Sequence, residues 1–384
     1  MGAALDPASR IAAWQRQAGR HHLPWQDTRD PYRIWLSEIM LQQTQAATVI
    51  PYYERFLARF PTVSALADAP ADTVLQAWAG LGYYARARNL HRCAQTIRDQ
   101  FGGRFPTRAA ELETLPGIGR STAAAIAAFS AGERVPILDG NVRRVLTRYL
   151  ALEGDPASAA TLRALWAEAQ AWLDRAPPEL DMRAYTQGQM DLGATVCTRS
   201  RPDCPRCPLK SDCAAFRLGL QDTLPAPRAR RSQPAHSCWM LVLECEGHLW
   251  LQRRPANGIW GGLWSLPAFA DSAGLETLCA GLPAPEGRHQ ALAAIEHVFT
   301  HFRLLMQPVR LRLAGPPPPI RDVQALAPPE RDPGGARASR NPVAISVQAG
   351  ESAWVPVAGL PDLGMPAPLS RLLLALYQPE PDLG

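Results

Sequence analysis

Apolar residues recur three and four positions apart over most of the first half of the chain. From residue 8 to about 215 the pattern occupies runs separated by Pro or Gly, which include 36–50, 62–79, 121–130, 141–152 and 158–174. This spacing places side chains on one face of an α-helix. The sequence therefore predicts an all-helical first domain.

The pattern changes in the second half of the chain. Short apolar runs at 238–245 and 248–252 flank Glu246-Gly247, which predicts a β-hairpin, and residues 298–313 have an extended pattern. A closing helix is expected near 369–377. This half is predicted to be an α+β domain.

Two segments are too rich in Pro, Arg and Gly to build a core. Residues 221–236 are predicted to form a linker, and residues 314–342 an irregular or disordered insert with no assigned function. We therefore expect a first domain at 1–220 and a second at 237–384. No internal repeat is found.

Composition narrows the class of protein. The chain has 384 residues, enough for two or three domains, and is 47% hydrophobic and 20% charged. It lacks an apolar run near the roughly 20 residues of a membrane-spanning helix, and its N-terminal residues lack an export signal. We therefore expect a cytoplasmic protein with no membrane partner. The net charge of +5 permits nucleic-acid binding without requiring it.

Four of the eight cysteines, Cys197, Cys204, Cys207 and Cys213, fall in one short segment. Four thiolates so close together can converge on one metal centre, either zinc or an iron-sulfur cluster. A four-cysteine zinc site usually pairs two C-x-x-C units, whereas this segment has only one, so the spacing favours a [4Fe-4S] cluster. Basic residues around it, among them Arg199 and Lys210, would suit phosphates.

A Gly-x-Gly turn precedes the helix predicted at 121–130. Gly117 and Gly119 would allow close approach of the backbone, and the amide groups at the start of the helix could bind a phosphate. Such a turn is, however, more often only a connection. Asp139 opens the helix at 141–152, where an Asp is by default an N-cap.

The helix predicted at 36–50 has an apolar face, including Leu36 and Ala47, and a polar face with Glu38, Gln42 and Gln45. A polar face is usually only solvated. Here an aromatic segment with Tyr83 and Arg86 follows, and aromatic rings interleaved with Arg suit stacking on bases and contact with phosphates.

Taken together, these motifs closely resemble the MutY family of adenine DNA glycosylases, within the helix-hairpin-helix glycosylase superfamily. The resemblance rests on SEIMLQQTQ, GLGYYARARNLH, LPGIGRSTA, PILDGNVRRVL and the cysteine cluster, and it covers about residues 10–220. It extends more weakly to Trp260–Trp264 and Phe299–Phe302, which look like that family's Nudix-like lesion-recognition domain.

The resemblance implies base-excision repair of double-stranded DNA, with removal of adenine mispaired with 8-oxoguanine or guanine. Hydrolysis of this bond requires protonation of the base and stabilisation of an oxocarbenium-like sugar, which two carboxyl groups can supply. By the family's pattern, protonated Glu38 donates to N7 of adenine and ionised Asp139 stabilises the sugar. Asn141 and Ser121 are expected to position these groups or the attacking water.

The family's pattern also assigns residues to the base and the DNA. A flipped adenine needs a pocket that binds it. The residues that match the family's pocket positions are Leu23, Trp25 and Gln187. Gln42 and Tyr83 match family positions that enter the DNA double helix beside the lesion. Gly117 and Gly119 match the family's phosphate-binding hairpin. The loop Phe299, Thr300 and His301 is expected to read 8-oxoguanine, although an ordinary strand is the alternative.

Two positions depart from the family's pattern. Arg143 stands where members often carry Lys, and Thr300 where they often carry Ser. The second half also lacks the R-E-x-x-E-E run of active Nudix hydrolases. We therefore expect this half to bind DNA and not to hydrolyse nucleotides.

Two other functions compete with this one. An endonuclease III-like lyase would need a lysine at position 121, where this chain has Ser121. A non-catalytic damage-sensing protein would fit better if Glu38 or Asp139 were absent. We therefore expect a monomeric, monofunctional glycosylase that leaves an abasic site.

Overall fold

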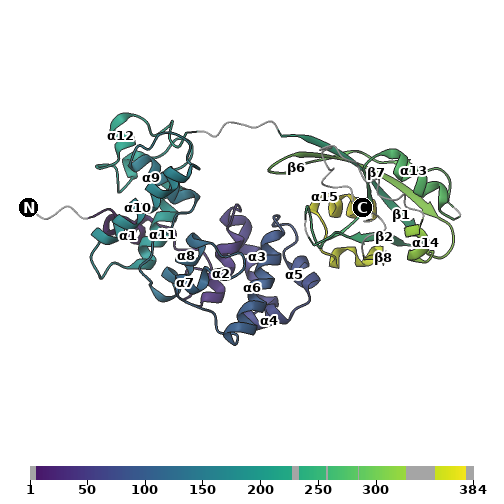
Figure 1. The fold of residues 1–384 in the computed structure, drawn as a ribbon, viewed down its shortest axis with the longest axis horizontal. Coiled ribbons are helices and arrows are strands. Elements are labelled where there is room, and N and C mark those ends of the chain that lie inside the picture. Colours follow the sequence, from purple (N-terminus) through teal and green to yellow (C-terminus); the bar gives the residue numbers. More distant parts are fainter. Residues whose placement is uncertain (1–5, 227–232, 257, 284, 326–350, 378–384) are drawn as a thin grey trace, which may run out of the picture. The chain divides into compact units, whose positions relative to one another are not determined.

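The computed structural model describes residues 6–226, 233–256, 258–283, 285–325 and 351–377. The chain forms two compact units (Figure 1). Unit 1 comprises Met1–Ala69 and Arg88–Arg230, and unit 2 comprises Pro70–Ala87 and Arg231–Gly384. Each unit has its own hydrophobic core and is described by itself.

Unit 1 is helical throughout its described residues, as the spacing of apolar residues predicts. Its longer helices are α1 (Pro7–Ala18), α2 (Pro31–Met40), α3 (Ala46–Arg59), α8 (Arg120–Ala131), α9 (Gly140–Tyr149), α10 (Ala159–Arg175) and α11 (Met182–Asp191), with most of α6 (Ala85–Phe101). Shorter helices are α4 (Val63–Asp68), α7 (Ala109–Leu112), η1 (Leu192–Val196), η2 (Cys204–Arg206) and α12 (Ala214–Leu218). In the core, α10 contributes Leu165 and Trp172 and α11 contributes Tyr185, all fully buried. None of the helices in the described parts of the chain is long and apolar enough to cross a membrane.

Local sequence explains where the helices that carry the site begin. Asp30 caps α2 and is followed by Pro31, whose ring favours the first helical position. Asp181 accepts hydrogen bonds from two backbone N–H groups at the start of α11. Asp139 accepts from the N–H of Val142 at 2.7 Å, so the default expectation of an N-cap for α9 is confirmed.

The continuous helix predicted over 36–50 is wrong. Helix α2 ends at Met40, and Gln43 has a φ of 58°, a left-handed conformation that a right-handed helix cannot include. Gln42 and Gln45 therefore do not share a helical face with Glu38. Ala47 is exposed instead of facing the core.

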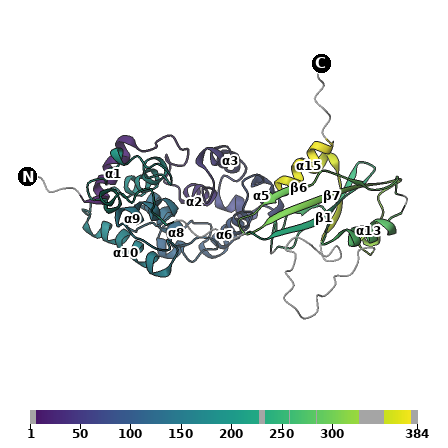
Figure 2. The same ribbon diagram turned by 90° about the horizontal axis from the view of Figure 1, so that it is seen from above.

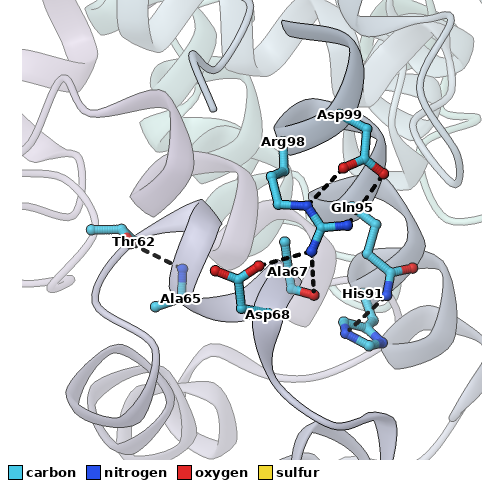
Figure 3. A network of polar contacts seen from close by, with 8 residues as sticks. All are labelled: Thr62, Ala65, Ala67, Asp68, His91, Gln95, Arg98 and Asp99. Carbon is cyan, nitrogen blue, oxygen red and sulfur yellow. Dashed lines mark hydrogen bonds and ion pairs between the residues drawn. The ribbon is translucent and has the colours of Figure 1, made fainter. Parts of the chain in front are cut away.

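The run at 62–79 also divides. Helix α4 ends before Pro70, and α5 (Ala71–Ala77) follows it. Figure 3 shows how the end of α4 is held: Arg98 of α6 donates to Asp68 at 2.8 Å and to the carbonyl of Ala67 at 3.4 Å. Arg98 also donates to Asp99 at 2.7 Å. This network anchors α4 just before the chain enters unit 2.

Unit 2 contains a twisted sheet with short helices. Its described strands are β1 (Ala235–Cys245), β2 (His248–Arg253), β3 (Trp264–Ser265), β4 (Ala268–Phe269), β5 (Gln290–Ala291), β6 (Ile295–Val298), β7 (Arg303–Leu313) and β8 (Ser352–Pro356). The central path is β3-β2-β1-β7-β5, with β4 on β1, β6 on β7 and β8 on β2. Strands β1 and β7 are parallel and lie side by side (Figure 2).

The predicted hairpin at Glu246-Gly247 is confirmed. Both turn residues have positive φ, 43° and 71°, which suits the twist of a two-residue hairpin. Helix α15 (Ala367–Tyr377) matches the expected closing helix. Helix α13 (Ser272–Gly281) packs Leu275 and Leu278 into the core of the sheet.

Three expectations for the second half need correction. The extended pattern at 298–313 is interrupted, because β6 ends at Val298 and the Phe299 N–H donates to the Phe302 carbonyl at 2.8 Å to close a turn. Part of the expected linker, Ala235 and the residue after it, belongs to β1. Part of the expected irregular insert forms α14 (Ile320–Ala325), while residues 326–342 lie outside the described residues.

The segment Pro70–Ala87 belongs to unit 2, which the sequence does not predict. The Tyr84 hydroxyl donates to the carbonyl of Met365 at 3.1 Å. Arg253 forms an ion pair with Asp72, and Gln76 donates to Asp362 at 3.4 Å. These contacts attach α5 and the loop after it to the sheet domain.

Candidate active site and cysteine cluster

A cavity of about 400 Å³ opens within unit 1. Its walls come from α1, α2, α11 and the loop between α1 and α2. The lining includes Trp25, Glu38, Arg183 and Gln187. A cavity of this size can hold a nucleobase with room for water.

Glu38 is the carboxyl group in the wall of this cavity. It lies on α2 between the fully buried residues Leu36 and Met40, so its position is set by the packing of that helix. Burial raises the pKa of Glu38 to about 8, with a smaller contribution from the negative charge of Asp139. A carboxyl group with this pKa holds a proton at neutral pH and can donate it.

Asp139 is the second carboxyl group, at the start of α9. Burial raises the pKa of Asp139, whereas the helix amides of Val142 and Asn141 and the charges of Arg144 and Arg143 act to lower it. Both causes of the shift at Glu38, burial and the charge of Asp139, raise its pKa. The amides and arginines around Asp139 therefore favour its ionised form, whereas both effects at Glu38 favour its protonated form.

Asn141 is held next to Asp139 by contacts on two sides. Its Oδ1 accepts from Nη2 of Arg144 at 2.8 Å. A Cβ on Gly193 would lie 2.5 Å from that of Asn141, so only glycine permits this approach of η1 to α9. Arg144 also donates to the carbonyl of Cys197 at 2.8 Å, which links this corner of the site to the cysteine segment.

Ser121 is placed at the first turn of α8. Its hydroxyl accepts from the backbone N–H of Leu138 at 2.9 Å and so holds the chain just before Asp139. This contact makes Ser121 a support for the carboxylate. A lysine at this position would lose that acceptor.

The expected pocket residues lie in the loop before α2 and on α11. Trp25 lines the cavity, and its ring packs edge-on against Tyr53 at 5.4 Å between centroids. Gln187 lines the cavity from α11. Leu23 is buried beside them, and its backbone N–H donates to the side chain of Gln26 at 3.1 Å. The structure thus brings Trp25 and Gln187 to the cavity that contains Glu38.

The Gly-x-Gly turn has the geometry expected of a backbone contact site. Gly117 has a φ of 78°, and a Cβ there would lie 2.7 Å from Cβ of Asn89. Gly119 is the N-cap of α8, with open space where a Cβ would stand. The first N–H groups of α8 can therefore be approached closely by a phosphate.

Unit 2 brings together two of the expected DNA-contact residues. The hydroxyls of Tyr83 and Thr300 lie 3.3 Å apart, within hydrogen-bonding distance. Tyr83 is 51% exposed, and its φ of 49° projects it from the loop after α5. Gln42, in the turn after α2, belongs to unit 1.

The other residues of this loop differ in burial. The ring of Phe299 stacks on Phe302 at 4.5 Å and contacts Trp260 and His297, so it supports the turn from within unit 2. Thr300 and His301 are exposed. The alternating strand that was the alternative for this region is absent, because 299–302 form the turn between β6 and β7.

The four clustered cysteines line a single cavity in unit 1, together with apolar side chains such as Val145 and Leu209. Nη1 of Arg148 donates to Sγ of Cys197 at 3.3 Å, a charge-assisted contact suited to a thiolate. Within the described residues, no three His, Cys, Asp or Glu side chains are arranged to hold a single metal ion. Four sulfur donors at one apolar cavity are compatible with either a zinc ion or an iron-sulfur cluster.

Sequence reasoning missed three residues that organise these sites. Arg148 is 2% exposed, and Arg144 bridges α9 to the cysteine segment. Asp191 is fully buried below Gln187. The sequence feature that could have identified one of them is a charged residue on the apolar face of a helix, as Arg148 is on α9.

Comparisons with known proteins identify the family of this chain. Residues 36–170 match the model for the HhH-GPD superfamily of base excision DNA repair proteins, and residues 238–375 match the NUDIX domain. An adenine DNA glycosylase of Buchnera aphidicola is 36% identical over 78% of this chain and 84% of its own length. The human adenine DNA glycosylase is 35% identical over 80% of this chain and 67% of its own. A thermostable thymine-DNA glycosylase structure aligns with a TM-score of 0.49 and 28% identity, over 55% of this chain and 95% of that one. Given such identity over most of both chains, together with two matching domains, the chain belongs to the adenine DNA glycosylase family.

Proposed function

We propose that this chain hydrolyses the N-glycosidic bond of adenine mispaired with 8-oxoguanine or guanine in double-stranded DNA. The observation that carries the proposal is the cavity with Glu38 in its wall, where burial raises the pKa of this carboxyl group to about 8, together with a second carboxyl group, Asp139, whose charge contributes to that shift. Adenine leaves only when protonated, and the developing sugar cation needs a nearby anion. The pair of carboxyl groups supplies both.

The steps follow from these positions. The adenine is extruded from the duplex into the cavity, beside Trp25 and Gln187. Glu38 donates its proton to N7, and the bond from the base to the sugar carbon breaks. Asp139 stabilises the positive charge on the sugar, and water completes the hydrolysis. Asn141 and Ser121 hold this end of the site in place.

The reaction is proposed to end at an abasic site. Strand cleavage by a lyase needs an amine to attack the sugar carbon. Position 121 carries a hydroxyl, and the chain's single lysine, Lys210, lies in the cysteine segment with its ammonium group 5.2 Å from the ring centroid of Phe216. The chain is therefore proposed to be monofunctional. We separately propose that it acts as a monomer.

An excision assay tests this function. Duplexes with A opposite 8-oxoguanine, G or C are incubated with the protein, and strand integrity is measured before and after alkali. We expect breaks only after alkali, with A opposite 8-oxoguanine and G as substrates. Borohydride should trap little or no covalent adduct. Breaks without alkali, or efficient trapping, would contradict the monofunctional mechanism, and no adenine release would contradict the activity.

We also propose that Cys197, Cys204, Cys207 and Cys213 hold a [4Fe-4S] cluster. Two observations support it: all four cysteines line one apolar cavity, and Arg148 contacts the sulfur of Cys197. Such a cluster would stabilise the segment after α11 and its basic residues, which suit DNA phosphates. No step of the hydrolysis requires it.

Metal analysis of the purified protein tests the cluster. Anaerobically prepared protein should be brown and contain about four iron and four sulfide per chain. Cys207→Ser should lose most of this iron, whereas Cys279→Ser, a half-buried cysteine of unit 2, should retain it. One zinc per chain with no iron would show that the segment is a zinc site instead.

The preference for 8-oxoguanine is assigned to the exposed residues Thr300 and His301. Phosphate contacts carry no base identity, so a preference requires contacts to the opposite base. A hydroxyl and an imidazole can bond to the altered edge of 8-oxoguanine. The half-buried ring of Phe299 would hold the turn in shape.

Point variants test this assignment better than truncation, because removing residues 226–384 would also deprive Pro70–Ala87 of its partners. Thr300→Val and His301→Ala should each lower the preference for 8-oxoguanine over G by about 2- to 10-fold, the worth of one hydrogen bond. Val298→Ala, at an exposed position just before the turn, is the matched control. If both variants keep the full preference, Tyr83 and Gln42 become the candidate lesion readers.

A further inference from the structure

A buried carboxylate below the cavity has no part in the proposed reaction. Asp191, the last residue of α11, has 0% of its surface exposed. Its Oδ2 accepts from the backbone N–H of Arg20 at 2.9 Å, and its Oδ1 accepts from Nε of Arg20 at 2.7 Å. A charge this deeply buried is tolerated because it is paired and hydrogen-bonded.

The same carboxylate reaches the cavity wall. Its Oδ1 accepts a second hydrogen bond, from Nε2 of Gln187 at 2.8 Å, one helical turn earlier on α11. A carboxylate paired with a guanidinium can only accept, so the arm of the Gln187 amide that faces it must be the NH₂ group. The carbonyl Oε1 is the opposite arm of this planar amide, and Gln187 lines the cavity that contains Glu38.

The backbone at Gly19 and Arg20 holds this arrangement firmly. A Cβ on Gly19 would lie 2.5 Å from the carbonyl oxygen of Gln15 and 3.1 Å from Oδ2 of Asp191. The Gln15 carbonyl therefore leaves no room for a side chain at Gly19, and the same stretch of backbone passes close to the carboxylate. Two donors of Arg20, its backbone N–H and its Nε, thus fix Asp191, and Asp191 in turn fixes the amide of Gln187.

We propose that Asp191 is a positioning residue that orients the amide of Gln187 so that its carbonyl oxygen meets the base. This inference rests on the proposed adenine glycosylase activity and deepens it. The 6-amino group of adenine donates hydrogen bonds, whereas position 6 of hypoxanthine or guanine carries an oxygen that only accepts. A carbonyl held toward this position bonds to adenine and leaves a 6-oxo purine facing a second acceptor, which the site rejects.

The test compares adenine with hypoxanthine, a purine that keeps N7 but has the 6-oxo group. Single-turnover excision of each base opposite 8-oxoguanine is measured for wild type, Asp191→Asn and Arg20→Gln. The backbone N–H of Arg20 is fixed and donates to Oδ2, so the single oxygen of the asparagine is expected to stay with it. Its NH₂ then replaces Oδ1 and cannot accept from Nε of Arg20 or from Gln187. Arg20→Gln breaks the same ion pair but keeps the carboxylate that orients Gln187.

We expect the ratio of adenine to hypoxanthine excision to fall by at least about tenfold in Asp191→Asn, the effect of one mispaired polar group. The ratio should stay within about threefold of wild type in Arg20→Gln, even if both rates fall. Gln187→Met, which removes the amide, should lose the same discrimination. Combining it with Asp191→Asn should cause no further loss.

A purely structural Asp191 would slow both bases equally, and an unchanged ratio in Asp191→Asn would overturn the inference while leaving the activity in place. If Asp191→Asn does not fold, as judged by circular dichroism, Gln187→Met decides, because an unchanged ratio in that variant equally overturns it. Absence of adenine release by the wild-type protein would instead reject the proposed function itself.

Discussion

Glu38→Gln is expected to abolish adenine release and at the same time to stabilise the protein. The amide keeps the shape of the side chain but has no proton to donate, so the excision rate should fall by about 10²- to 10⁴-fold, the usual worth of a general acid. Binding to a duplex that contains the mispair should persist. Rates from single-turnover excision and affinities from equilibrium binding separate the two effects.

The stability gain follows from the pKa of Glu38, which is about 8 in the folded protein against 4.5 for an unperturbed glutamate. Between these values the folded state binds a proton that the unfolded state has lost, so stability falls as the pH rises through this window. At pH 7 the difference is on the order of 3 kcal/mol. Glutamine does not titrate, so the variant lacks this pH dependence of stability. Its stability advantage over the wild type should vanish below about pH 4, where Glu38 is protonated in both the folded and the unfolded protein.

Denaturant unfolding at several pH values measures this effect. Asp27→Asn, an exposed carboxylate on the rim of the same cavity, is the control, and its stability should change by no more than about 0.5 kcal/mol. The wild-type excision rate should also fall as the pH rises above about 8, since Glu38 then loses its proton. Substantial turnover by Glu38→Gln would remove Glu38 from the mechanism.

Arg148→Met should cause the largest loss of stability. The Arg148 guanidinium donates to the carbonyls of Leu224, Thr198 and Arg199 at 2.8, 2.6 and 3.2 Å. Methionine fills the space but leaves these carbonyls without that donor, at a cost of about 1 to 3 kcal/mol for a buried group such as the Leu224 carbonyl and less for the two part-buried ones. The expected loss is about 3 to 5 kcal/mol in unfolding free energy, with loss of the iron of the proposed cluster.

Two variants separate the geometry of Arg148 from its charge. Arg148→Lys keeps the charge but offers a single ammonium, which cannot reach acceptors spread over the cysteine segment and residue 224, so it should rescue little. Arg206→Met, an exposed arginine of the same segment, should change stability by no more than about 0.5 kcal/mol. A stable, iron-loaded Arg148→Met protein would contradict this role.

The sequence by itself determined the secondary structure wherever local chemistry decides it. The helices at 121–130 and 158–174, the turn at Glu246-Gly247 and the cap at Asp139 follow from periodicity, from two consecutive turn residues and from a short carboxylate before a helix. The spacing of four cysteines likewise predicted a shared metal centre, and the family resemblance of the sequence around Glu38 made that residue a candidate. These features depend on residues close together in the chain.

Only the tertiary structure decided which distant residues share a site. The break after Met40, the transfer of Pro70–Ala87 to unit 2 and the helix at Ile320–Ala325 all depend on packing against remote segments. The raised pKa of Glu38 likewise arises from burial, which no local pattern encodes. Arg148 and Asp191 read as ordinary charged residues in the sequence. Folding buries both residues among carbonyls and donors that lie 50 to 171 residues away in the chain. An unpaired charge in such a place would be too costly to keep.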